Sequence, residues 1–255
     1  MERRELLWKG LAGISLAWLP QPLISGGQVA AADDDDTATF YDLWEEARLC
    51  QHWLEDKRAL DLYRQLLECA APKLTTEGHA DILEAMRILR EALEETERYL
   101  PAQQAAVQAN PEDPEKHFYL GFTLIRLGRY EEALVEFQAA LRNPEALCRH
   151  CYHNCWINIG WYYYRRERYG EALQWFERAY QLEDSDNPLL HYDHALALEN
   201  KLLANVALGR RQEAEANARE YISRFGRLPW PERRALGKLG IDADAIYLDR
   251  YGHLG

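Results

Sequence analysis

One spacing of apolar, small and aromatic positions occurs twice in the chain. Each copy has an apolar residue followed directly by a glycine and, three residues after the glycine, a second large apolar residue. Nine residues after that second apolar residue, the pattern Ala-x-x-x-Phe-x-x-Ala begins. The copies cover residues 117–140 and 156–179, which places them 39 residues apart. Because the apolar positions recur every three to four residues, each copy predicts two amphipathic helices joined by a turn.

Glycine and phenylalanine hold the two most informative positions of this pattern. Gly121 and Gly160 fall inside the first predicted helix, where glycine costs about 1 kcal/mol relative to alanine. That cost indicates that a neighbouring helix passes close to the backbone. Phe137 and Phe176 lie on the second predicted helix, and we expect them to fill the space between adjacent hairpins. Gly128 falls between the two helices of the first copy, a usual place for left-handed backbone angles.

Less regular copies flank these two. Residues 208–218 repeat the turn and the second helix, and residues 59–66 predict the second helix of an earlier hairpin. The stretch 82–109 is strongly helical in composition, and we expect Pro101 to interrupt it. The predicted organisation is a leader over 1–31, an acidic spacer over 32–39, a helical array over 40–226 with clear repeats at about 114–147 and 153–186, and a C-terminal cap over 227–255.

The spacing Trp-x-x-Ile-Gly-x-x-Tyr followed by Ala-x-x-x-Phe resembles the tetratricopeptide repeat (TPR), closely in 156–179 and well in 117–140. The resemblance implies an all-α solenoid of helical hairpins, wound as a right-handed superhelix and closed by a C-terminal capping helix. It also implies a concave surface lined by the first helices, where TPR proteins bind extended peptides or helices. We therefore expect an adaptor or assembly factor that binds a protein or peptide, and not an enzyme.

TPR repeat positions place aromatic, apolar and arginine side chains on that concave surface. Such residues on a face meant for solvent indicate partner binding, because Trp, Tyr and Arg carry much of the energy of protein interfaces. We expect at least half of them to be exposed; the alternative is that they pack under a neighbouring helix or the cap. The predicted groove residues are Phe118, Phe122, Ile125, Arg126, Asn154, Ile157, Trp161, Tyr164 and Arg165, with Glu199, Leu203 and Val206 from the less regular third repeat.

Three cysteines and two histidines lie where the two clear repeats meet: Cys148, His150, Cys151, His153 and Cys155. The offset of 39 residues exceeds the roughly 34 residues of a TPR. We therefore expect the cluster on an insertion between the repeats and on the first turn of the next helix. Thiolates with an imidazole can bind zinc, and three thiolates can hold an iron–sulfur cluster. In an oxidising compartment, one disulfide and an odd thiol form instead. The sequence leaves a disulfide, a metal site and free thiols open and requires no cofactor. A metal-binding or redox protein that uses this cluster is therefore the alternative function.

The first 31 residues resemble an export signal. Arg3 and Arg4 are followed by two leucines and a lysine, similar to a twin-arginine signal, although Leu6 stands where Phe is commoner. The apolar run over 11–19 is shorter than the roughly 20 residues that span a bilayer, and 29–31 is a small-residue cleavage pattern. An ordinary secretory signal is the alternative. Either signal predicts export to a periplasm or thylakoid-type lumen, with no stable membrane span after cleavage.

Charge and the remaining motifs narrow the partner class. A net charge of −12 and a pI near 5.2 disfavour binding to nucleic acid or anionic lipid. The other histidines have no Ser or Cys nucleophile at a recognisable spacing, and no glycine-rich phosphate loop occurs. Cys50 and Cys69 fall at helix positions, where we expect buried small side chains.

Overall fold

The computed structural model describes residues 43–44, 46–47, 50, 55–70, 76–182 and 188–252. These residues form helices and turns, and no strand occurs among them. Every helix in this part of the chain is too short or too polar to cross a membrane. The predicted leader and acidic spacer lie outside the described residues.

The chain divides into two compact units. Of the described residues, those up to 106 and those of 122–129 form unit 1, and those of 107–121 and 130–252 form unit 2. Helix α5 (Pro114–Arg126) contributes its first eight residues to unit 2 and the remainder to unit 1.

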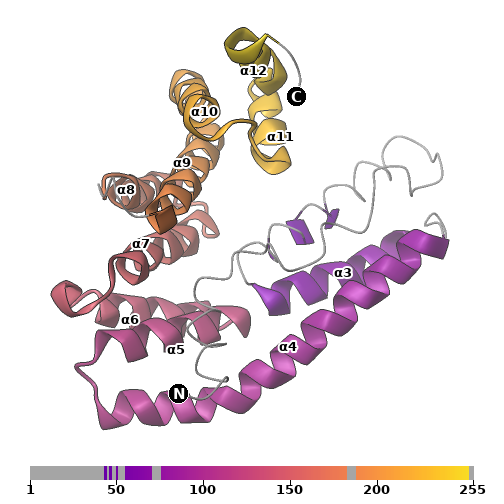
Figure 1. Cartoon of the computed structure of the whole chain (residues 1–255). Coiled ribbons are helices and arrows are strands. Elements are labelled where there is room, and N and C mark those ends of the chain that lie inside the picture. Colours follow the sequence, from indigo (N-terminus) through magenta and orange to yellow (C-terminus); the bar gives the residue numbers. More distant parts are fainter. Residues whose placement is uncertain are drawn as a thin grey trace. The chain divides into compact units, whose positions relative to one another are not determined.

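Unit 1 is built around α3 (Asp56–Ala70) and the long helix α4 (Thr76–Ala109) (Figure 1). Only the last turn of α4 lies outside this unit. Helical spacing puts Ala59, Tyr63 and Leu66 on one face of α3, and all three are buried against apolar residues of α4. Pro101 lies inside α4, so the expected interruption was wrong. Proline removes one amide donor, and Pro101 is exposed, where water can satisfy the carbonyl left over.

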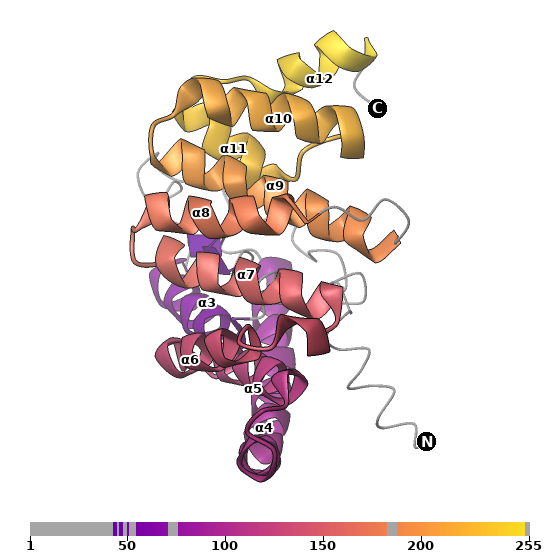
Figure 2. The same ribbon diagram turned by 90° about the vertical axis from the view of Figure 1, so that its left-hand side faces the viewer.

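Unit 2 is a row of helical hairpins. The first half of α5 precedes α6 (Tyr130–Ala140), a short 3-10 turn η2 (Pro144–Ala146), α7 (Arg149–Tyr164) and α8 (Tyr169–Tyr180). The helices α9 (Pro188–Ala207), α10 (Arg211–Phe225), α11 (Trp230–Lys238) and α12 (Ala243–Tyr251) complete it. Figure 2 shows α7, α8, α9 and α10 stacked one upon the next. The predicted all-α architecture of helical hairpins is confirmed in the described residues.

Contacts between non-consecutive helices define the two layers of this unit. Helix α9 packs against α7 and against α11, so the first helices of successive hairpins are neighbours. Helix α12 packs against α10 and α11. The cap therefore has two helices, where the resemblance implied one, and Asp242 begins the second of them by accepting hydrogen bonds from the amides of Asp244 and Ala245.

Each phenylalanine fills the interior of its own hairpin, whereas the spacing predicts a place between adjacent hairpins. Phe137 and Phe176 are both buried, and their rings lie against the backbone at Gly121 and Gly160. A Cβ atom on Gly121 would lie 2.8 Å from Cε1 of Phe137, and one on Gly160 would lie 2.7 Å from Cδ1 of Phe176, with Cε1 closer still. Gly128 has a φ of 72°, which confirms the left-handed turn expected there.

This contact predicts a large effect for one methyl group. Gly160→Ala should lower the free energy of unfolding by about 1–3 kcal/mol, because the Phe176 ring must move. Gly170→Ala is the matched control, since a Cβ there meets nothing within 4 Å, and it should leave stability unchanged or raise it by up to about 1 kcal/mol. Urea denaturation of both variants measures the difference; equal stabilities would contradict the packing.

Candidate functional site

In unit 2 the side chains that the sequence assigned to a groove lie on α5, α7 and α9, and α11 packs beside α9. Trp161 and Tyr164 of α7 have ring centroids 4.8 Å apart, and the guanidinium of Arg165 lies 5.7 Å from the centre of the Trp161 ring. Their spacing along α7 places them with Asn154 and Ile157 on one face of the helix. We call the face formed by α7, α9 and α11 the first-helix face.

Burial corrects the exposure expected for several predicted groove residues. Phe118, Ile125, Ile157 and Trp161 are less than a tenth exposed, and the other five of the nine are half-buried. The reason is ring packing inside each hairpin: Phe118 stands edge-on to Phe137, and Trp161 stands edge-on to Phe176. Of the third-repeat positions, Glu199 and Leu203 are buried and Val206 is half-buried. The partner-binding role of the set stays a prediction.

Three of the nine residues, Phe122, Ile125 and Arg126, belong to unit 1. There the guanidinium of Arg126 donates to the buried carboxylate of Asp56 at 2.6 Å, which ties α5 to the start of α3. This ion pair engages the Arg126 charge within the fold. Six predicted groove residues thus remain for a surface of unit 2. They are Phe118 on the first half of α5, and Asn154, Ile157, Trp161, Tyr164 and Arg165 on α7 or directly after it.

Two buried carboxylates lie on the first-helix face, one on α9 and one on α11. Glu199 and Glu232 are 8% and 5% exposed, and the charge of Glu199 raises the cost of ionising Glu232. Burial raises the pKa of Glu199 to about 7, although the hydroxyl of Tyr221 donates a hydrogen bond to it. Burial and the charge of Glu199 raise the pKa of Glu232 well above its ordinary value.

Glu232 is the member of this pair that the sequence did not single out. It follows Trp-Pro and precedes two arginines, a context typical of an exposed helix start. Its Oε2 atom is buried without a hydrogen-bond partner, and the adjacent Arg233 pairs instead with Asp244. No signal in the local sequence shows this burial, because it results from α11 packing on α9. Burial of both carboxyls therefore favours their protonated forms.

The acidic pair predicts a specific pH dependence of stability. Glu199 has a folded-state pKa of about 7 against an ordinary 4.5, so between these values the folded chain keeps a proton that the unfolded chain releases. The contribution of Glu199 to the free energy of unfolding should therefore fall by roughly 2–3 kcal/mol between about pH 5 and pH 8, and Glu199→Gln should remove this contribution. Glu232, whose pKa is also raised, adds a fall of its own that the variant keeps.

The measurement is urea denaturation across that pH range, taken as the difference between wild type and variant. The difference is needed because His153 acts in the opposite direction: burial lowers its pKa to about 4, so its contribution to stability grows as pH rises toward 6.5. The exposed Glu213→Gln is the control and should keep the wild-type slope. An unchanged slope in Glu199→Gln would show that this carboxyl ionises normally.

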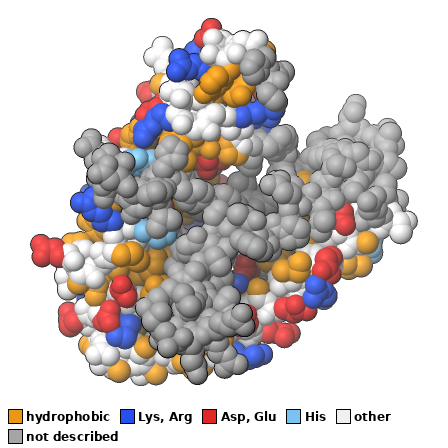
Figure 3. Space-filling view, viewed as in Figure 1, with side chains coloured by type: hydrophobic (Ala, Val, Ile, Leu, Met, Phe, Trp, Pro, Cys, Tyr) orange, Lys and Arg blue, Asp and Glu red, His pale blue; other side chains and the backbone are white. Residues whose placement is uncertain are grey.

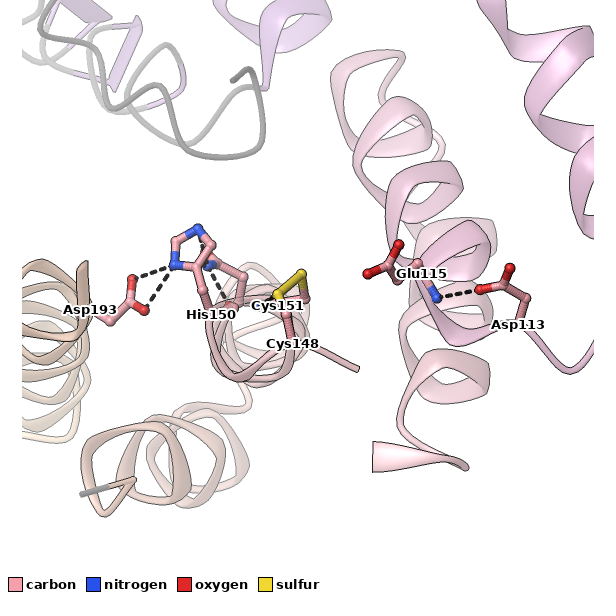
Figure 4. Close-up of a disulfide and its surroundings, with 7 residues drawn as sticks. Asp113, Glu115, Cys148, His150, Cys151 and Asp193 are labelled. Atoms are coloured by element: carbon pink, nitrogen blue, oxygen red, sulfur yellow. Dashed lines mark hydrogen bonds and ion pairs between the residues drawn. A yellow bond between two sulfur atoms is a disulfide. The ribbon is translucent and has the colours of Figure 1, made fainter. Parts of the chain in front are cut away.

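The cysteine cluster occupies the start of α7, as the 39-residue offset predicted. Cys148 is the residue that caps α7, and its Sγ accepts the amide of Cys151 at 3.0 Å. The two sulfurs are joined in a disulfide. Figure 4 shows this disulfide with Asp113 and Glu115 of the α5 start on one side and His150 on the other. Cys155, one turn beyond Cys151, is fully buried, and burial raises the pKa of its thiol.

The two histidines of the cluster face α9 and its buried Asp193. Nδ1 of His150 lies 2.9 Å from the Asp193 carboxylate, and Nδ1 of His153 lies 3.8 Å from it. His153 is fully buried, and neither of its ring nitrogens has a hydrogen-bond partner within 3.5 Å. The neighbouring carboxylate favours a charged imidazole, but burial outweighs it and lowers the pKa of His153 to about 4.

The state of the cysteines bears on the alternative that the cluster binds zinc or an iron–sulfur cluster. With Cys148 and Cys151 in a disulfide, neither sulfur is a thiolate ligand in this state. Among the residues that the structure describes, no group of three or more His, Cys, Asp or Glu side chains is arranged to hold a metal ion. The chemistry that the cluster supports directly is that of a disulfide.

Other residues that the sequence analysis considered are the cysteines of α3 and before it, and the other histidines. Cys50 is buried as expected, but Cys69 is exposed near the end of α3, so that expectation was wrong. His117 joins the two helices of its hairpin, with Nδ1 2.6 Å from Glu136. On the face of the molecule in Figure 3, basic and acidic side chains of the described residues are interspersed, with no broad basic area.

The two regular repeats match a known family of helical hairpins. Residues 115–183 match the family model described as tetratricopeptide repeat. A crystal structure of YrrB, described as a TPR protein with an unusual peptide-binding site, is 18% identical and aligns with a TM-score of 0.41 over 82% of this chain and 100% of that one. The comparison with curated proteins returned no match. Over residues 115–183 this chain is therefore similar to tetratricopeptide repeats.

Proposed function

We propose that this chain is an exported adaptor or assembly factor that binds a protein or peptide through the first-helix face of unit 2. The observation that carries the proposal is the match of residues 115–183 to tetratricopeptide repeats, whose tandem hairpins make α7 a neighbour of α9. A binding role needs no catalytic residue. The net charge of −12 favours a protein partner over nucleic acid.

The side chains of α7 support this surface. Tyr164 and Arg165 are half-buried at the end of the helix, beside the buried ring of Trp161. Tyrosine and arginine are the residue types that most often dominate interface energy, because each combines apolar area with a polar group. The buried Trp161 ring packs edge-on against the ring of Tyr164 and supports it from the side of the core. The proposed contact residues are thus Asn154, Tyr164 and Arg165, with Trp161 as their support.

Two variants separate contact from support. Affinity capture from the exported fraction, followed by mass spectrometry, identifies the partner, and its affinity is then measured by calorimetry. Arg165→Ala should weaken that affinity at least about fivefold with unchanged stability. Trp161→Ala should lower the free energy of unfolding by about 3 kcal/mol, since it removes a buried ring from the contact with Phe176. Arg178→Ala on α8 is the control, because Arg178 is exposed over Trp175 on a second helix. Equal affinities of Arg165→Ala and Arg178→Ala would contradict the proposed face.

The proposed export rests on the first 31 residues. The arginine pair, the short apolar run and the small-residue pattern support a leader of the twin-arginine type. That route would deliver the folded chain to a periplasm or thylakoid-type lumen.

Replacement of both arginines tests this route. Arg3→Lys with Arg4→Lys should abolish export, because the pathway distinguishes arginine from lysine although the charge is kept. Immunoblots of the exported and retained fractions measure the outcome, and Lys9→Arg serves as a control that preserves the pair. Normal export of the double-lysine variant would mean that an ordinary secretory signal operates.

A further inference from the structure

The Cys148–Cys151 disulfide joins an exposed residue to a buried one. Cys148 is exposed at the start of α7, whereas Cys151 is 5% exposed in the first turn of the helix. A thiol outside the protein therefore approaches Cys148 more readily than Cys151. The two ends of this disulfide thus differ in access, which is what a directed exchange reaction requires.

The start of α7 also suits the sulfur that would be released. Cys148 caps a 16-residue helix, and the amide of Cys151 donates to its Sγ at 3.0 Å. The unpaired amides at the start of a helix favour negative charge, so this position stabilises a thiolate on Cys148. Reduction of the disulfide would leave that sulfur as the cap of the same helix.

Stability gives little reason for this disulfide. The cysteines are three residues apart, so the bond closes a very short loop and restricts the unfolded chain much less than a long-range disulfide does. The start of α7 is held independently by the hydrogen bond between His150 and Asp193 of α9. A disulfide that adds little to the fold, at an exposed helix start, fits a chemical role better than a structural one.

We propose that Cys148 and Cys151 form a redox-active pair that exchanges its disulfide with the thiols of a protein partner. A thiolate of a partner dithiol attacks Sγ of Cys148, the Cys148–Cys151 bond breaks, and Cys151 leaves as a thiolate that takes up a proton. The second partner thiolate then attacks the partner's own sulfur in the mixed disulfide and releases Cys148. The partner dithiol loses two electrons and this pair gains them; a second disulfide compound, such as glutathione disulfide, restores the pair by the reverse steps.

Neighbouring groups leave this exchange accessible. His150 is engaged with Asp193 on the far side of α7. Of the two carboxylates at the start of α5, Asp113 is paired with Lys116, and Glu115 is exposed to water. Cys155 is enclosed, and burial keeps it in the thiol form, so it does not compete for an incoming disulfide.

The first experiment uses the intact oxidised protein in buffers with varied ratios of reduced to oxidised glutathione. Acid quenching, alkylation and mass spectrometry of the peptide that contains residues 148–151 give the reduced fraction, and circular dichroism follows the fold. The proposal predicts reversible reduction by millimolar glutathione with the helical signal intact. A pair that stays oxidised until denaturant is added would be a structural disulfide and would overturn the proposal.

The second experiment assigns the two sulfurs. Cys151→Ser leaves Cys148 as the reactive thiol, and it should form a mixed disulfide with a synthetic disulfide peptide at least about tenfold faster than Cys148→Ser does. Cys155→Ala is the control and should retain glutathione exchange at the wild-type rate. Equal trapping by the two serine variants, or loss of exchange in Cys155→Ala, would refute the assignment. The variants are compared only after circular dichroism shows matching helical signals.

Discussion

The contact between a phenylalanine ring on one helix and a glycine backbone on its partner is the constraint on which the repeats depend. Phe176 lies where a Cβ of Gly160 would be, and Phe137 has the same relation to Gly121. Each glycine weakens its own helix by about 1 kcal/mol, and the close approach that it permits buries a whole aromatic ring in return. Each hairpin also buries a face against its neighbour, and in unit 2 α7 packs against α9 and α9 against α11.

This packing of neighbouring hairpins buries two kinds of side chain in unit 2: aromatic rings, which stabilise it, and carboxylates, which do not. It encloses Trp161 beside Phe176, which turns a residue suited to a binding surface into part of the core. It also encloses Glu199 and Glu232, two acids without a neutralising cation in the contacts described for them, so protonation takes the place of an ion pair. Buried carboxylates of this kind lower stability at high pH, and such a cost is more often found where a surface has a role beyond folding.

Helix α7 carries the chemistry of unit 2 at both of its ends. Its first turn holds the Cys148–Cys151 disulfide and the His150 link to α9, while its last turn presents Tyr164 and Arg165. A partner bound at the first-helix face and a thiol donor at the start of α7 would thus meet the same rigid element. The 3-10 turn of η2 before α7 supplies the extra residues that separate the cysteines from the preceding hairpin.

The sequence alone determined the helical hairpins, because the positions that specify them are local: a glycine, a small residue and a phenylalanine at helical spacing encode each pair. The placement of the cysteine cluster at the start of a helix followed in the same way from the length of the offset. Tertiary structure decided what local spacing does not encode. Whether Trp161 is surface or core depends on the ring that faces it, Glu232 became buried because α11 docks on α9, and α4 continues through Pro101 because that turn faces water. Whether a side chain is buried depends on how two helices pack together, so the spacing of residues within one helix does not show it.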